Sequence, residues 1–168
     1  MAKEYIFRTL RLLTGLFLYG LGSYMGIQAN VGLAPWEAFS MGISYKTGIL
    51  FGNVVVYTGL IIIVIDFLVK EKIGFGTLLN AMIIGKVVDL CNYLDIIPMM
   101  DNFFAGIGVL LAGQVVICLG SYFYIGAGLG CGPRDALMVA IGKKLNKFPI
   151  GLVRGLLEGT VLLIGWLL

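Results

Sequence analysis

The sequence predicts an all-α membrane protein, a helical bundle of five transmembrane spans. The first observation is composition: of the 168 residues, 60% are hydrophobic and only 12% are charged. Soluble domains carry about 25% charged residues. Disordered chains and coiled coils also depend on charge, so all three classes are excluded. The other two observations are long uncharged runs and an internal repeat.

Five apolar runs are long enough to cross a bilayer, which needs about 20 mostly apolar residues. They cover residues 12–36, 47–65, 73–94, 102–133 and 148–168. The first run exceeds the apolar stretch of a signal peptide and lacks a cleavage pattern, so we predict that it is a span. The runs are continuous and do not alternate between apolar and polar residues. This favours helices over a barrel, because lipid-exposed backbone must satisfy its own hydrogen bonds.

The basic residues predict the orientation of these spans. Eight of the twelve lie in three regions: Lys3, Arg8 and Arg11; Lys70 and Lys72; and Lys143, Lys144 and Lys147. A single threading of the five spans places all three regions on the same side of the membrane. We therefore predict a multi-pass membrane protein with a cytoplasmic N-terminus and Lys46 on the opposite side.

An internal repeat divides the chain into residues 1–97 and 98–168. When the chain is shifted by 98 positions, residues 22–43 align with 120–141, and nine of these 22 positions are identical. Composition alone would give roughly two identities, which indicates a duplication. The first half holds three spans, an odd number, so the second half enters from the other side. We expect an inverted 3+3 repeat whose sixth span is missing, lost or truncated.

Within the second repeat, residues 128–138 read Gly-Leu-Gly-Cys-Gly-Pro-Arg-Asp-Ala-Leu-Met. This segment resembles the signature of the YczE/YyaS/YitT family of bacterial integral membrane proteins. Weaker matches occur at residues 32–36, at 72–77, and at Val153-Arg154 followed by Glu158. The resemblance covers nearly the whole chain and implies a six-span architecture in the bacterial plasma membrane. It implies no particular activity, because the family has no settled biochemical function.

The glycine-rich segment of this signature is a candidate substrate-binding site. Gly130 and Gly132 interrupt a helix, and Pro133 suits the first turn of a new one. One interpretation is a broken helix whose N–H groups, together with Arg134, attract an anion. The alternative is a plain turn at the cytoplasmic interface, where Asp135 caps the helix dipole and Arg134 touches lipid headgroups.

The first repeat carries a matching motif with a different residue beside the proline. Trp36 stands where Arg134 stands in the second repeat, and Glu37 matches Asp135. Glu37 can occupy the first helical turn, as its counterpart does. A single Trp near the end of a span favours an interfacial anchor, although a site accessible from two sides would also suit such an asymmetric pair.

Two spans carry charges within their apolar runs, namely Lys86 with Asp89 and Arg154 with Glu158. The spacings of three and four residues place each couple on one helix face. Charges in a membrane are costly, so we expect both couples to pair in the bundle interior. A structural clamp is the favoured interpretation. A polar substrate or proton path, extended by Asn80, is the other one.

Glycine at every fourth position of the last run, at 151, 155 and 159, lets another helix approach closely. This packing would occur either inside the bundle or in a homodimer. The three cysteines are far apart in apolar stretches, and we interpret them as packing residues.

These observations favour a small transporter or permease for a small polar or anionic solute. The alternative is a membrane scaffold or an accessory subunit of a membrane assembly. We expect no enzyme, because histidine, a metal-binding cluster and a nucleotide-binding loop are all missing from the sequence. The expected partners are the lipid bilayer and a small molecule or ion, with no cofactor, no metal and no nucleic acid.

Overall fold

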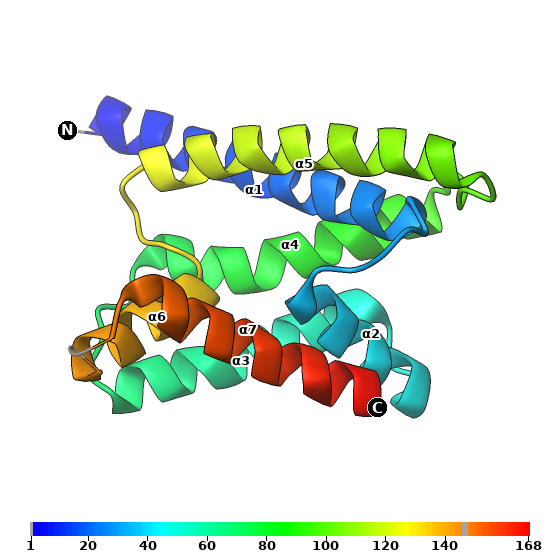
Figure 1. Ribbon diagram of the computed structural model, residues 1–168. Helices are drawn as coiled ribbons and strands as arrows, with labels where there is room; N and C mark the ends of the chain where they lie inside the picture. Colours follow the sequence, from blue (N-terminus) through cyan, green and yellow to red (C-terminus); the bar gives the residue numbers. More distant parts are fainter. Residues whose placement is uncertain (1, 146–147) are drawn as a thin grey trace.

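The computed structural model describes residues 2–145 and 148–168, and these residues form seven helices (Figure 1). They are α1 (Ala2–Gln28), α2 (Pro35–Thr47), α3 (Phe51–Leu68), α4 (Phe75–Tyr93), α5 (Phe103–Gly126), α6 (Pro133–Lys144) and α7 (Ile150–Leu167). Five of them, α1, α3, α4, α5 and α7, are long and apolar enough to span a membrane. The prediction of an all-α membrane protein with five spans is therefore confirmed.

Two of the long apolar runs each contain the end of one helix and the start of another. The run 12–36 is divided between α1, which ends at Gln28, and α2, which begins at Pro35. In the same way the run 102–133 ends with Pro133, the first residue of α6. Proline occupies the first turn of both short helices, as expected for a residue that lacks the N–H a helix interior needs.

The first span begins earlier than its uncharged run. Helix α1 starts at Ala2 and carries Lys3, Arg8 and Arg11 on regular helix. Arg8 pairs with Glu4 one turn away, with 2.7 Å between Nη2 and Oε1. Long basic side chains extend toward the headgroups, so a helix can continue beyond its apolar part.

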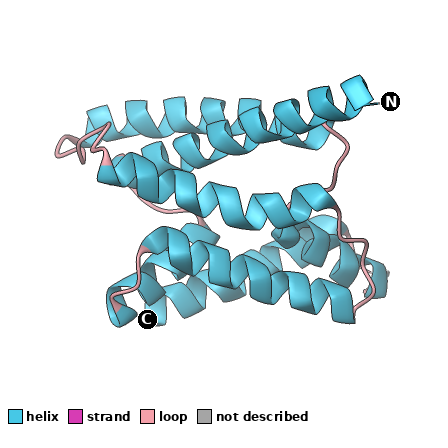
Figure 2. Ribbon diagram, turned by 180° about the vertical axis from the view of Figure 1, so that it is seen from behind, coloured by secondary structure: helices cyan, strands magenta, loops and turns pink. Residues whose placement is uncertain are grey.

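The connections lie at the two ends of the bundle (Figures 1 and 2). The N-terminus, the α3–α4 connection and the α6–α7 connection share one end, whereas the α4–α5 connection and the C-terminus lie at the other (Figure 1). A salt bridge of 2.7 Å between Lys143 and Glu71 joins α6 to the α3–α4 connection. The described residues of the three basic regions therefore lie at the same end of the bundle, as the orientation argument requires; Lys147 lies outside the described residues.

Lys46 and Lys144 provide a test of this arrangement in a membrane. They lie in the last turns of α2 and α6, which run to opposite ends of the bundle (Figure 1). In a background without the three native cysteines, a membrane-impermeant thiol reagent applied to intact cells should label Lys46→Cys and not Lys144→Cys. Labelling of both variants from the same side would contradict the threading and the cytoplasmic N-terminus.

Helices α1 and α5 pack closely through glycines. A Cβ atom at Gly15 would lie 2.7 Å from the Gly120 carbonyl oxygen, and one at Gly22 would lie 2.6 Å from that of Gly113. The 98-residue shift maps Gly22 onto Gly120 and Gly15 onto Gly113, so it exchanges the two contacts. Contacts between elements follow the same rule, because α2 packs on α7 and α6 packs on α3. Any repeat whose halves are related by a twofold axis predicts this exchange; the inverted arrangement and the direction of the axis stay predictions.

Helix α3 packs on α4 through a regular stripe. Its buried positions include Gly52, Val55, Gly59, Ile62 and Asp66, which alternate in steps of three and four. Gly52 meets the backbone of Gly85, and a Cβ at Gly59 would lie 2.8 Å from the Cβ of Ala81. The stripe is therefore the face on which α3 meets the rest of the bundle.

Helices α2 and α6 are too short to cross a bilayer. They have 13 and 12 residues, or about 20 Å at 1.5 Å per residue, against a hydrocarbon thickness of about 30 Å. Both begin toward the middle of the molecule and run outward in opposite directions (Figure 1). Their first turns therefore lie inside the bundle.

Candidate functional site

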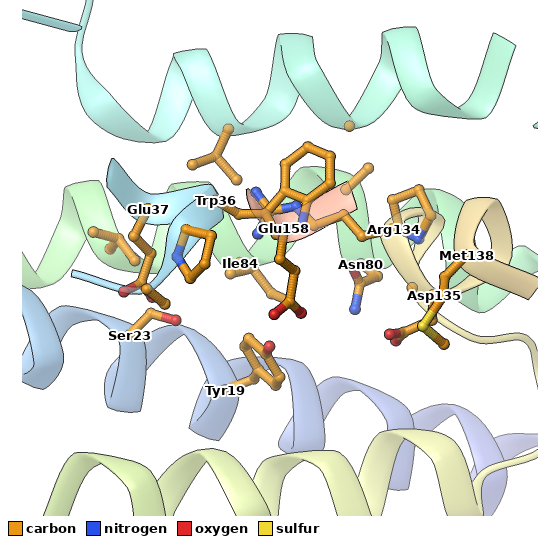
Figure 3. Close-up of a pocket in the computed structure, with 18 of the residues that line it drawn as sticks. Tyr19, Ser23, Trp36, Glu37, Asn80, Ile84, Arg134, Asp135, Met138 and Glu158 are labelled. Carbon is orange, nitrogen blue, oxygen red and sulfur yellow. The ribbon is translucent and has the colours of Figure 1, made fainter. Parts of the chain in front are cut away.

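A cavity of about 200 Å³ lies where the first turns of α2 and α6 approach each other, and all seven helices contribute to its wall. Pro35, Trp36 and Glu37 line it from α2, and the segment 132–135 lines it from α6. A water molecule takes about 30 Å³ in the liquid, so the cavity has room for several waters or one small solute. Figure 3 shows the side chains that point into it.

The two helix starts leave backbone donors available to the cavity. The residues that precede the first turns, Ala34 and Gly132, make no side-chain cap. An acid, Glu37 or Asp135, occupies the third position of each helix. Helix N-termini have N–H groups without intrahelical partners and a partial positive charge. Two such ends at one cavity form a setting that favours a negative group.

Arg134 and Trp36, the matched residues of the two repeats, contact each other in the cavity. The Arg134 guanidinium carbon lies 4.8 Å from the centroid of the Trp36 ring, within cation–π range. Both side chains are half-buried and line the cavity wall (Figure 3). The structure thus places Trp36 and Arg134 in the cavity wall, where the first turns of α2 and α6 lie inside the bundle. An interfacial position for Trp36 and a lipid-headgroup position for Arg134 stay predictions.

Tyrosines form the wall on the side of α1 and α5. The Tyr124 hydroxyl donates to Asp135 Oδ2 at 3.1 Å, and the Tyr19 ring meets the Tyr124 ring edge-on at 6.1 Å. Figure 3 shows Glu37 and Ser23 at one end of the cavity and Asp135 at the other. Tyr19 and Tyr124 both line the cavity.

Arg154 and Glu158 form the predicted ion pair, with 2.8 Å between Nε and Oε1. Their position differs from the expected one, since their side chains are 63% and 33% exposed and line the cavity at its open side. The glycine stripe beside them does not pack on another helix of the described chain. A Cβ at Gly151, Gly155 or Gly159 would meet no atom within 4 Å.

Lys86 and Asp89 do not form the ion pair that the sequence predicts, and neither lines the cavity. Asp89 Oδ1 instead accepts the backbone N–H of Gly52 at 2.7 Å, which caps the start of α3 from the neighbouring helix. Lys86 is exposed and donates to Asn53 Oδ1 at 2.6 Å. Because α3 lies close to α4, Asp89 and Lys86 form hydrogen bonds with Gly52 and Asn53 of α3 and not with each other.

Gly130, another candidate, also lies outside the cavity wall. It adopts a φ of +126°, which side chains rarely allow, and a Cβ there would lie 2.8 Å from Thr77 Oγ1. Its loop packs on the start of α4, where Gly76 N donates to the Leu129 carbonyl at 2.8 Å. Its glycine therefore serves the turn that places α6.

Five spans and two half-helices that meet at an internal cavity define a multi-pass helical membrane protein. The chain belongs to the family of unknown function DUF6198, whose model matches residues 6–168. This agrees with the resemblance found in the sequence, since named relatives include YczE and YyaS.

Three relatives illustrate the similarity. The uncharacterized membrane protein YczE of Bacillus subtilis (strain 168) is 31% identical over 168 residues, which covers 99% of this chain and 77% of the relative. An uncharacterized protein of Haemophilus influenzae is 31% identical over 160 residues, covering 94% and 71%. The uncharacterized protein YyaS of Bacillus subtilis is 27% identical over 158 residues, covering 89% and 75%. No solved structure matches the chain significantly.

Proposed function

We propose that the protein is a transporter or permease for a small polar or anionic solute, and that it acts without catalysis. The observation that supports this most is the convergence of two half-helix N-termini on one cavity that also contains Arg134. Many secondary transporters bind substrate near the bilayer midplane with discontinuous helices whose N-termini point at negative groups.

The charges around the cavity favour a solute with one negative group. Arg154 is bonded to Glu158, whereas Arg134 takes part in no salt bridge within residues 2–145 and 148–168. The Arg134 guanidinium therefore keeps donors for a carboxylate or phosphate oxygen. Glu37 and Asp135, at opposite ends of the cavity, would accept donors from the solute and repel a second negative group.

Uptake by proteoliposomes tests the proposal with radiolabelled acetate, glycine and inorganic phosphate as probes. We expect saturable uptake of at least one probe above empty vesicles. A hydrogen bond to a charged group contributes about 1.5–3 kcal/mol, so Arg134→Gln should lower this uptake by about 10–100-fold. The matched control is Arg8→Gln, because Arg8 lies near the N-terminus and pairs only with Glu4.

Equal rates for the wild type, Arg134→Gln and empty vesicles would contradict transport of these solutes. In that case the scaffold or accessory-subunit function gains support, because the glycine stripe of α7 is open to a partner helix. Its discriminating measurement is the size of the native complex in mild detergent, which Gly151→Leu would then reduce.

A further inference from the structure

Asp66 is a buried acid that the cavity does not use. It lies on α3 with no exposed surface, and neither carboxylate oxygen has a hydrogen-bond partner among the described residues. It shares the buried face of α3 with Gly59, which lines the cavity. Seven residues separate them, or about 10 Å along the helix.

The register of α3 and α4 places Asp66 level with the start of α4. The helices are antiparallel, with Gly52 against Gly85 and Gly59 against Ala81. Three backbone donors at that start already have partners: Gly74 N bonds Thr77 Oγ1, Gly76 N bonds Leu129 O, and Thr77 N bonds Gly74 O. None of these three donors is free to bind the Asp66 carboxylate.

No salt bridge within residues 2–145 and 148–168 involves Asp66. Helix α6 packs on α3 and buries only apolar side chains, from Pro133, Ala136, Leu137 and Ala140. From the α3–α4 connection, the charged group that acts on Asp66 is Glu71. A hydrogen bond from Lys143 holds the Glu71 pKa below its usual range, so it is an anion. From the α5–α6 loop, the thiol of Cys131 is the titratable group nearby.

An ionised carboxylate in such surroundings is costly, and a buried acid without a partner takes up a proton instead. We propose that Asp66 is a proton-binding site, which holds its proton while α6 covers α3 and exchanges it when these two helices separate. The same helix α6 carries Arg134 into the cavity. In the proposed transport cycle, which is a separate claim, movement of α6 would therefore couple the solute to a proton.

Infrared spectroscopy of the purified full chain at pH 5 tests the site without any solute. The wild type should show the C=O band of a protonated carboxylic acid, and Asp66→Asn should lose that component. Asn has nearly the shape of the protonated acid and should fold; Asp66→Leu is the second variant if it does not. The matched control is Asp95→Asn, an exposed acid beyond the end of α4, which should keep the band.

Thermal melting against pH provides the second readout. The folded wild type keeps a proton that the unfolded chain releases, so its melting temperature should fall as pH rises from 5 to 8 by more than that of Asp66→Asn. Identical infrared bands and parallel melting curves for the two proteins would overturn the proposal. Loss of the band in Asp66→Asn without probe uptake by the wild type would overturn transport only, and would keep the proton site.

Discussion

Replacing Gly52 with leucine is expected to prevent stable folding. A Cβ atom at this position would overlap the Gly85 carbonyl oxygen and the Asp89 carboxylate. The first is backbone, and the second is held by the Gly52 N–H. The Gly85 oxygen cannot move without separating α3 from α4, and the carboxylate can move only by losing its hydrogen bond with the Gly52 N–H. Overpacking a tight core costs about 1–3 kcal/mol and occasionally more. Because the clash here involves a backbone atom of the neighbouring helix, we expect a cost at the upper end of this range or above it.

Gly151→Leu is the matched control for this substitution. Gly151 is the second residue of α7, as Gly52 is of α3, but a Cβ there would meet no atom within 4 Å. Thermal melting in detergent should show a near wild-type melting temperature for Gly151→Leu and aggregation or a much lower melting temperature for Gly52→Leu. Equal losses in both variants would show that the α3–α4 crossing is not the tight contact described.

Glu158→Gln is expected to have the second largest effect on stability. The substitution leaves the Arg154 guanidinium without its carboxylate at the open side of the cavity, within a spanning helix. Breaking a buried pair typically costs about 3–5 kcal/mol, and exposed pairs contribute about 0.2–1 kcal/mol. With Glu158 one-third exposed, we expect a loss near 2 kcal/mol, between these limits.

Glu4→Gln serves as the comparison, because Glu4 and Arg8 form a pair with the same four-residue spacing and a similar length of 2.7 Å. That pair lies at the exposed end of α1, so its loss should cost less than about 0.5 kcal/mol. Melting curves of both variants in detergent, reported relative to the wild type, measure the difference. If the two variants melt at the same temperature, the Arg154–Glu158 pair contributes no more to stability than the exposed Arg8–Glu4 pair does.

Hydropathy predicted the spans well because a bilayer demands long apolar helices, and prolines located the starts of α2 and α6. The start of α1 was missed for a physical reason. Arg8 and Arg11 end an uncharged run, but their side chains can reach water while the backbone stays helical. A rule based on uncharged residues therefore finds the apolar part of a helix and not its ends.

The repeat located the centre of the candidate site, because the matched residues Trp36 and Arg134 meet there. It could not find Tyr19, whose counterpart after the shift is Ile117. Asp66 was missed because it directly follows the apolar run 47–65 and precedes a charged loop. In the sequence it therefore resembles the first exposed residue after a span. The alternation of three and four residues from Gly52 through Gly59 was the signal that placed it inside.

A spacing of three or four residues on one helix predicts that two charged side chains can reach each other, but not that they pair. Lys86 and Asp89 fit that spacing, yet each has a partner on α3. Those partners depend on how closely α3 and α4 cross, and local spacing carries no information about that distance.

The exchange of short helices between the halves has a consequence for synthesis. Helix α2 packs mainly on α7, which follows it by more than 100 residues along the chain, and α6 packs mainly on α3 from the first half. During translation the face of α2 that receives α7 therefore stays uncovered until α7 has been synthesised and inserted. The insertion machinery or a chaperone is expected to shelter α2 during that interval.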